Sequence, residues 1–129
     1  MWTIEVDYRT GDSFHTEEVY KEQIGQCWTH KKGAITALKV IEEHSEYTAL
    51  TDCNYYGNMS EKQQKDRIAE LKKKDWFSEE WGGHTMYVIN DEGERVYQSA
   101  FWAGYFETLR EARVVSVDDE DDDCVFRPH

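Results

Sequence analysis

Apolar and polar residues alternate at the start of the chain, with apolar side chains at positions 2, 4, 6 and 8. A period of two predicts a half-buried strand, with one face toward the core and the other toward water. TGDS at 10–13 supplies turn residues, and FHTEEVY at 14–20 is typical of a return strand. The first twenty residues therefore predict a β-hairpin.

The middle of the chain changes to a helical period. Apolar residues recur at 34, 37, 38 and 41, which predicts a helix with one apolar stripe over 34–44. We expect 24–33 to connect the hairpin to this helix, whereas 46–58 is ambiguous and is compatible with a short strand followed by a loop. Ser60 and Gln63 have the spacing of a capping box, which predicts the start of a polar surface helix over 61–74.

The last third predicts more β-structure. TMYVIN at 85–90 and RVYQSA at 95–100 flank the turn sequence DEGE, which predicts a second hairpin. We expect a helical turn over 101–112 and a last, β-branched strand over 113–117. The sequence therefore predicts one α+β domain at 1–117, with an antiparallel sheet of about five strands and two or three helices on one face. Its edge strands could pair two copies into a homodimer.

The negative net charge of the chain limits the classes of partner that it can bind. The formal net charge is −12 over 129 residues, of which the last thirteen residues contribute −5. The remaining body is at −7, so the acidic character is not confined to the C-terminal segment at 118–129. Nucleic acid and anionic membrane surfaces repel such a chain, so we expect direct binding to neither.

The cysteines and the N-terminus point to a cytoplasmic protein. Three widely spaced cysteines are an odd number and do not form a disulfide framework, so we expect free thiols in a reducing compartment. The start of the chain lacks the basic and apolar regions of a signal peptide. Its apolar runs also fall short of the roughly 18 residues that a transmembrane helix needs.

Catalytic and metal-binding motifs are weak. Cys27 and His30 form a C-x-x-H pair, but a structural zinc site needs four ligands and no second compact pair follows. The acidic run at 118–123 lacks the spacing and the glycine of a calcium-binding loop. Isolated Ser, Cys and His occur without a nucleophile motif such as G-x-S-x-G. We therefore expect a protein without catalytic residues, metal or cofactor.

Two segments carry a resemblance to known sequences. VDYRTGDSF at 6–14 and FWAGYFETLREARVV at 101–115 resemble segments of small, uncharacterised proteins of tailed bacteriophages. The resemblance covers about a third of the chain and includes no catalytic motif. It implies a phage setting, with the host cytoplasm as the place of action, and in that setting small acidic proteins are suspected of countering host defences.

The first functional hypothesis is a non-enzymatic interaction protein. Its acidic surface would mimic nucleic acid and inhibit a basic host protein, such as a restriction or CRISPR-type effector. Acids recur on polar faces in the pairs Glu5 and Asp7, Glu17 and Glu18, Glu42 and Glu43, Glu79 and Glu80, and Asp91 and Glu92. The residues expected to bind the partner are the acids Asp118, Asp119, Glu120, Asp121, Asp122 and Asp123 and the exposed aromatics Tyr55, Tyr56, Trp76, Phe77 and Trp81.

Two alternatives remain open at this point. The chain could sequester a small ligand such as a signalling nucleotide, with aromatic rings stacking on the base. Its phosphates would then meet cations drawn from Lys31, Lys32, Arg95, Arg110 and Arg113. Alternatively, the chain could be a structural or assembly protein of the phage, held together by edge-strand pairing.

Overall fold

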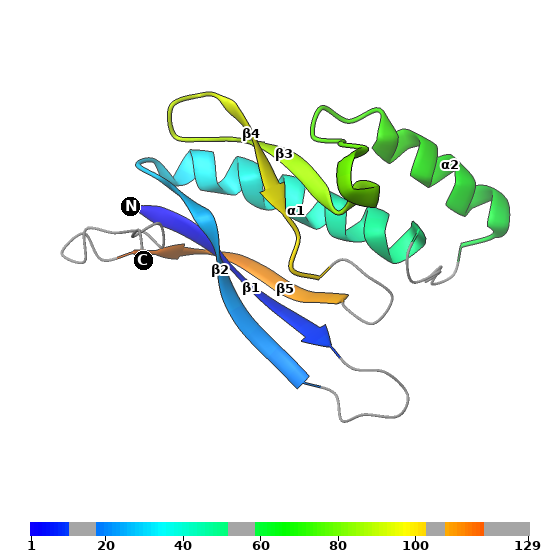
Figure 1. The fold of residues 1–129 in the computed structure, drawn as a ribbon, viewed down its shortest axis with the longest axis horizontal. Helices are drawn as coiled ribbons and strands as arrows, with labels where there is room; N and C mark the ends of the chain where they lie inside the picture. Colours follow the sequence, from blue (N-terminus) through cyan, green and yellow to red (C-terminus); the bar gives the residue numbers. More distant parts are fainter. Residues whose placement is uncertain (11–17, 52–58, 103–107, 118–129) are drawn as a thin grey trace.

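The computed structural model describes residues 1–10, 18–51, 59–102 and 108–117. It has an α+β fold in which five antiparallel strands and two α-helices are described, as the sequence predicts. The strands form two separate sheets, one of three strands in the order β2-β1-β5 and one made by the β3–β4 hairpin. In Figure 1 the helix α1 lies between these two sheets, and it contacts both β5 and β3.

The three-stranded sheet is built around the first strand. β1 (Trp2–Thr10) pairs on one side with β2 (Glu18–Trp28) and on the other with β5 (Thr108–Ser116). Ile4 and Val6 on β1 are fully buried, which confirms the apolar face of the predicted hairpin. β2 continues through 24–28, where a connection was expected, because Ile24 and Trp28 are also buried core residues.

Helix α1 (Lys31–Thr51) is longer than its predicted range. Its apolar stripe continues past His44 through Tyr47 and Leu50, both of which are buried. Residues 46–58 were ambiguous in sequence, and the interpretation as a short strand is wrong up to Thr51, because α1 continues through these residues. Helix α2 (Glu61–Lys72) begins where the capping box predicts, with reciprocal hydrogen bonds between Ser60 and Gln63.

The second sheet covers the opposite side of α1. After the 3₁₀-helix η1 (Glu80–Gly83), β3 (Thr85–Ile89) and β4 (Arg95–Ser99) form the predicted second hairpin. Met86 and Val88 of β3 face the core. The helical turn expected over 101–112 is wrong from Thr108 onward, because these residues pair with β1 as part of β5. Residues 103–107 lie outside the described part of the chain.

Candidate functional site

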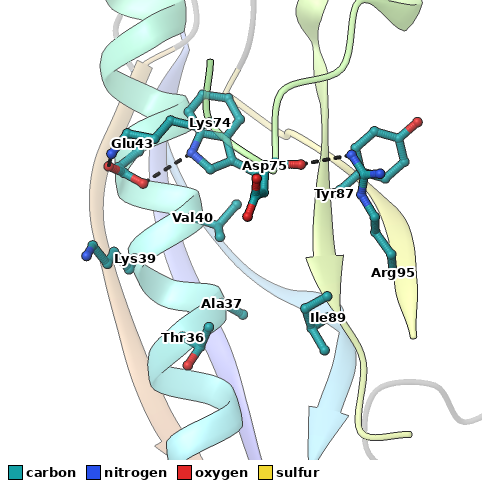
Figure 2. A pocket seen from close by; sticks show the side chains of 11 residues that line it. Thr36, Ala37, Lys39, Val40, Glu43, Lys74, Asp75, Tyr87, Ile89 and Arg95 are labelled. Carbon is teal, nitrogen blue, oxygen red and sulfur yellow. Dashed lines mark hydrogen bonds and ion pairs between the residues drawn. The ribbon is translucent and has the colours of Figure 1, made fainter. Parts of the chain in front are cut away.

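A cavity of about 480 Å³ lies between α1 and the β3–β4 hairpin. Figure 2 shows Ala37 and Val40 of α1 and Ile89 of β3 in the space between the two elements. The buried ring of Trp76 also lines this cavity. A volume of this size is within the range that proteins use to hold small ligands, roughly 300–1,000 Å³.

On the helix side of the cavity, a negative charge is compensated within the protein. The Glu43 carboxylate accepts a hydrogen bond of 3.1 Å from Nε1 of Trp76. The ammonium group of Lys74 pairs with the same carboxylate at 3.1 Å. Through these two contacts Glu43 joins the segment after α2 to α1. Its negative charge is compensated, so it has little effect on a ligand in the cavity.

On the hairpin side, one cation is held in a defined orientation. The Arg95 guanidinium lies 3.9 Å from the centre of the Tyr87 ring, and one of its N–H groups donates to the backbone oxygen of Asp75 at 2.9 Å. Lys39 of α1 also lines the cavity, and Figure 2 shows its side chain extending to the side of the helix away from Arg95. The cavity thus has an apolar interior with charged groups on its two sides.

A second candidate feature is the turn that contains η1, referred to below as the Trp81 turn and comprising residues 79–84. Trp81 is 79% exposed, the highest value among the exposed large hydrophobic residues of the described chain. Its backbone has φ 56°, a left-handed conformation that residues other than glycine adopt infrequently. Two exposed acids, Glu79 and Glu80, precede it directly.

Buried groups hold this turn in place. His44 of α1 is fully buried, and its Nε2 donates a hydrogen bond of 2.8 Å to the backbone oxygen of Gly83. The Thr85 hydroxyl donates to the Ser78 hydroxyl and the Glu80 backbone oxygen, each at 3.2 Å. The turn is therefore attached to α1 on one side and to the start of β3 on the other.

Two tyrosines face each other across the β3–β4 hairpin. Tyr87 and Tyr97 are directly opposite each other in the register, with ring centroids 4.5 Å apart and hydroxyl groups hydrogen-bonded at 2.7 Å. The hydrogen bond with Tyr87, partial desolvation and a further hydrogen bond with Glu80 raise the pKa of Tyr97. These contacts link the Trp81 turn to an exposed aromatic surface that the sequence prediction did not include, although two tyrosines at facing hairpin positions are a readable signal.

The predicted aromatic anchors separate into different environments. Trp81 is exposed as expected, but Trp76 is only 4% exposed and belongs to the hydrophobic core, so it is not accessible to a partner. Phe77 is half-buried and packs against the same core. Apolar residues in the sequence DWFSEEW have no clear period, so the pattern could not separate buried from exposed rings. Tyr55 and Tyr56 lie outside the described residues.

Several acids that were expected to face a partner are engaged within the fold. Arg113 of β5 donates hydrogen bonds to both Glu5 and Asp7 of β1, and its hydrogen bond lowers the pKa of Asp7. Asp91 accepts hydrogen bonds from the hydroxyl and the backbone N–H of Thr29, which lower its pKa. These carboxylates therefore already have hydrogen-bonding partners within the fold.

The charge is distributed unevenly along the chain. Residues 118–129 hold six acids and one Arg, so they carry five of the twelve net negative charges, and residues 1–117 carry the other seven. The predicted partner-binding acids at 118–123 are these six acids, and they lie outside the described residues.

The cations expected to meet a nucleotide do not gather at one place. Arg113 is occupied by Glu5 and Asp7 on the three-stranded sheet. Lys31 lies over the ring of Trp2, 5.0 Å from its centre. Of the five expected cations, Arg95 alone lines the cavity beside α1.

The described residues contain no group of three or more His, Cys, Asp or Glu that could hold a metal ion. Cys27, one half of the C-x-x-H pair, is buried and takes part in a disulfide. The expectation of free thiols is therefore wrong for Cys27, and it no longer supports a reducing compartment. The two other cysteines, Cys53 and Cys124, lie outside the described residues.

Comparison with protein-family models, with curated proteins and with solved structures found no match. Within the described part of the chain, no helix combines the length and the apolar character needed to cross a membrane. Function must therefore be argued from the charges, the cavity and the exposed aromatic residues.

Proposed function

We propose that this chain is a non-enzymatic protein that binds and inhibits a basic, nucleic-acid-handling protein, such as a restriction or CRISPR-type effector of a phage host. The distribution of charge carries this proposal. Six consecutive carboxylates at 118–123 follow β5, and the residue after that strand, Val117, donates a backbone hydrogen bond to Met1 at 2.9 Å. The last described residue before the acidic run therefore lies beside the N-terminus, at one end of the three-stranded sheet.

A concentrated run of carboxylates favours fast capture of a basic partner. It presents closely spaced negative charges, as a nucleic-acid backbone does, and long-range attraction raises the rate of encounter. Residues 1–117 carry seven of the twelve net negative charges, so the folded domain would add to this attraction and also contribute shape and apolar contacts.

Competition with nucleic acid tests this proposal. The chain is immobilised and exposed to a bacterial lysate freed of nucleic acid, and the retained proteins are then challenged with duplex DNA. We expect basic nucleic-acid-binding proteins to be retained at low salt and released both by DNA and by high salt, because they would use one surface for both ligands. Retention of proteins that neither DNA nor salt displaces would contradict mimicry.

A second candidate function is the binding of a small ligand in the cavity beside α1. The observation that favours it is the oriented Arg95, held by Tyr87 and the Asp75 backbone at the edge of an apolar space. Such a guanidinium retains N–H groups for an anionic ligand atom. A phosphate-bearing nucleotide is the ligand class that the sequence suggests.

A thermal-shift screen with mono-, di- and cyclic nucleotides tests the second function. A ligand that binds the folded state raises the melting temperature in proportion to its saturation of the site. The Arg95→Gln variant should lose that shift, whereas Arg110→Gln, which removes an exposed cation that does not line the cavity, should keep it. An unchanged melting temperature with every nucleotide would exclude this function for the ligands screened.

A further inference from the structure

The geometry points to Trp81 as a preorganised anchor that inserts into an apolar pocket of the partner, at a place where that pocket is bordered by Lys or Arg. This inference rests on the proposed function and names the contact that the folded body makes.

The backbone conformation of Trp81 is unfavourable for its residue type. At φ 56° the Cβ atom of any residue other than glycine is crowded by its own backbone, and Trp has none of the local hydrogen bonding that helps Asn or Asp tolerate this region. Gly82 and Gly83 follow directly, so glycine is used in this turn at the neighbouring positions. A tryptophan at position 81 therefore makes the turn harder to form than a glycine would.

Hydrogen bonds and packing against α1 hold the turn in this conformation. The Gly83 backbone oxygen is bound by the buried His44 side chain, and the His84 N–H donates to the Trp81 backbone oxygen at 3.2 Å. Gly83 itself lies against the Tyr47 ring, where an added Cβ would come within 3.2 Å of a ring carbon. The indole is thus presented from a rigid base, which lowers the entropy lost when a partner immobilises it.

The exposed ring has no evident role in folding. Trp81 is 79% exposed, whereas Trp28, Trp76 and Trp102 are each at most 4% exposed and form part of the core. Strained backbone and a large exposed apolar ring both oppose stability, and residues with such strain are concentrated at binding and catalytic sites. Tryptophan is also among the residues that contribute most to binding energy at protein interfaces.

The charges beside the ring define the partner. Glu79 and Glu80 are exposed and stand immediately before Trp81, and Glu80 is also hydrogen-bonded to the exposed Tyr97. A partner surface that binds the indole also comes close to these carboxylates. Acidic residues around its pocket would be repelled by Glu79 and Glu80. The complementary site is an apolar pocket flanked by cations, which agrees with the basic partner of the proposed function.

Two substitutions that both remove the ring separate binding from folding. Trp81→Ala removes the indole and keeps the unfavourable left-handed backbone conformation. Trp81→Gly also removes the indole, but glycine adopts this conformation without strain. We expect Trp81→Gly to keep or raise the melting temperature, measured by thermal unfolding. A clear fall in melting temperature for Trp81→Gly would show that the ring supports the fold, and would overturn the inference.

Binding is measured with the same lysate freed of nucleic acid, and each retained protein is quantified by mass spectrometry on beads carrying wild type or a variant. Retention of the DNA-displaceable proteins should fall at least about 30-fold for both Trp81→Ala and Trp81→Gly. Ile35→Ala, which truncates another exposed apolar side chain on α1, is the matched control and should retain them as wild type does. Glu79→Gln should weaken retention more than Glu92→Gln, an exposed acid in the β3–β4 turn.

The outcomes distinguish this inference from the proposed function. If the Trp81 variants retain the DNA-displaceable proteins as well as wild type does, the anchor is wrong and the charge-based function stands. If no protein is displaced from wild type by DNA, the proposed function and the anchor fail together. If Ile35→Ala loses binding as strongly as Trp81→Ala, the contact is not specific to the Trp81 turn, which also overturns the inference.

Discussion

Gly33, in the first turn of α1, lies against the buried indole of Trp28. A Cβ atom at position 33 would come within 2.6 Å of a carbon of that ring. The ring cannot move away freely, because its Nε1 donates to the backbone oxygen of Ile89 at 2.9 Å and so joins β2 to β3. Glycine is therefore required here by close packing, although it disfavours a helix.

The substitution Gly33→Ala tests this packing. In an unobstructed helix, alanine is favoured over glycine by roughly 1 kcal/mol. Here we expect the opposite sign, a loss of about 1–3 kcal/mol in the free energy of unfolding, because a well-packed core is being overfilled. Urea denaturation measures it. Gly25→Ala on β2, where an added Cβ has no neighbour within 4 Å, is the matched control and should change stability little.

The Asp7 carboxylate predicts a dependence of stability on pH. Its pKa is lowered from the ordinary value of 3.8, mainly by the hydrogen bond from Arg113. A lowered pKa in the folded state stabilises the protein above pH 3.8, and this contribution is lost as pH falls through the folded-state pKa.

Asp7→Asn should therefore be less stable than wild type at neutral pH, and the difference should shrink in acid. Urea unfolding at a series of pH values measures it. Asp66→Asn, which changes an exposed acid on α2, should show a smaller difference. A gap between Asp7→Asn and wild type that is unchanged from neutral pH to well below pH 3.8 would contradict the role given to Arg113.

At the scale of elements, α1 organises the molecule through buried polar contacts as well as packing. His44 is the contact by which α1 holds the Trp81 turn. His44→Phe keeps a ring of similar shape but leaves the Gly83 backbone oxygen without this donor. We expect a loss of about 1–3 kcal/mol, the usual effect of leaving a buried polar group without its partner.

Hydrogen exchange adds a local measurement for this variant. The His84 N–H, which closes the turn onto Trp81, should exchange faster in His44→Phe. Thr48→Val serves as the control, because the Thr48 hydroxyl is bonded to Ser45 within the same helix. Equal protection of the His84 amide in wild type and His44→Phe would show that α1 does not hold the turn.

The sequence predicted those helices and strands that are determined by residues close to one another in the chain. The capping box at Ser60, the β3–β4 hairpin and the apolar face of β1 follow from spacing over a few residues, and each is present. The strand predicted over 113–117 is present as the second half of β5, but the first half of β5 was missed. Thr108 and Leu109 are strand residues through their pairing with Arg9 and Tyr8 at the far end of the chain. A pairing between the two ends of the sequence has no signature within either segment.

The candidate site was only partly predictable for the same reason. The exposure of Trp81 was expected, but its left-handed backbone depends on contacts with His44 and Tyr47, which are distant in sequence. The cavity beside α1 likewise requires the position of the hairpin relative to the helix. The burial of Trp76 follows from its packing against His44 and Tyr47, which no pattern in its own segment indicates.

At the scale of the whole molecule, the proposed function gives different physical roles to the described fold and to the acidic run. α1 lies between the two sheets (Figure 1), and Trp81 and Tyr97 are exposed at the surface. Six carboxylates lie in one run at 118–123, next to the C-terminal end of β5 in the sequence. In our account the run accelerates encounter with a basic partner and the Trp81 turn limits dissociation.

The central claim is tested most directly by the rate at which this chain associates with one of the retained proteins that DNA displaces. It is measured from about 50 to 500 mM NaCl, a range in which the screening length falls severalfold. In one variant all six acids at 118–123 are neutralised, with Asn in place of each Asp and Gln in place of Glu120. The control carries six such changes at the exposed acids Glu22, Glu42, Glu61, Asp66, Glu92 and Glu94.

We expect wild type to associate at least about tenfold faster at low salt than at high salt. The variant neutralised at 118–123 should lose most of that dependence, and the control should retain more of it although its net charge is the same. Association that is independent of salt, or equally fast in all three proteins, would contradict the account.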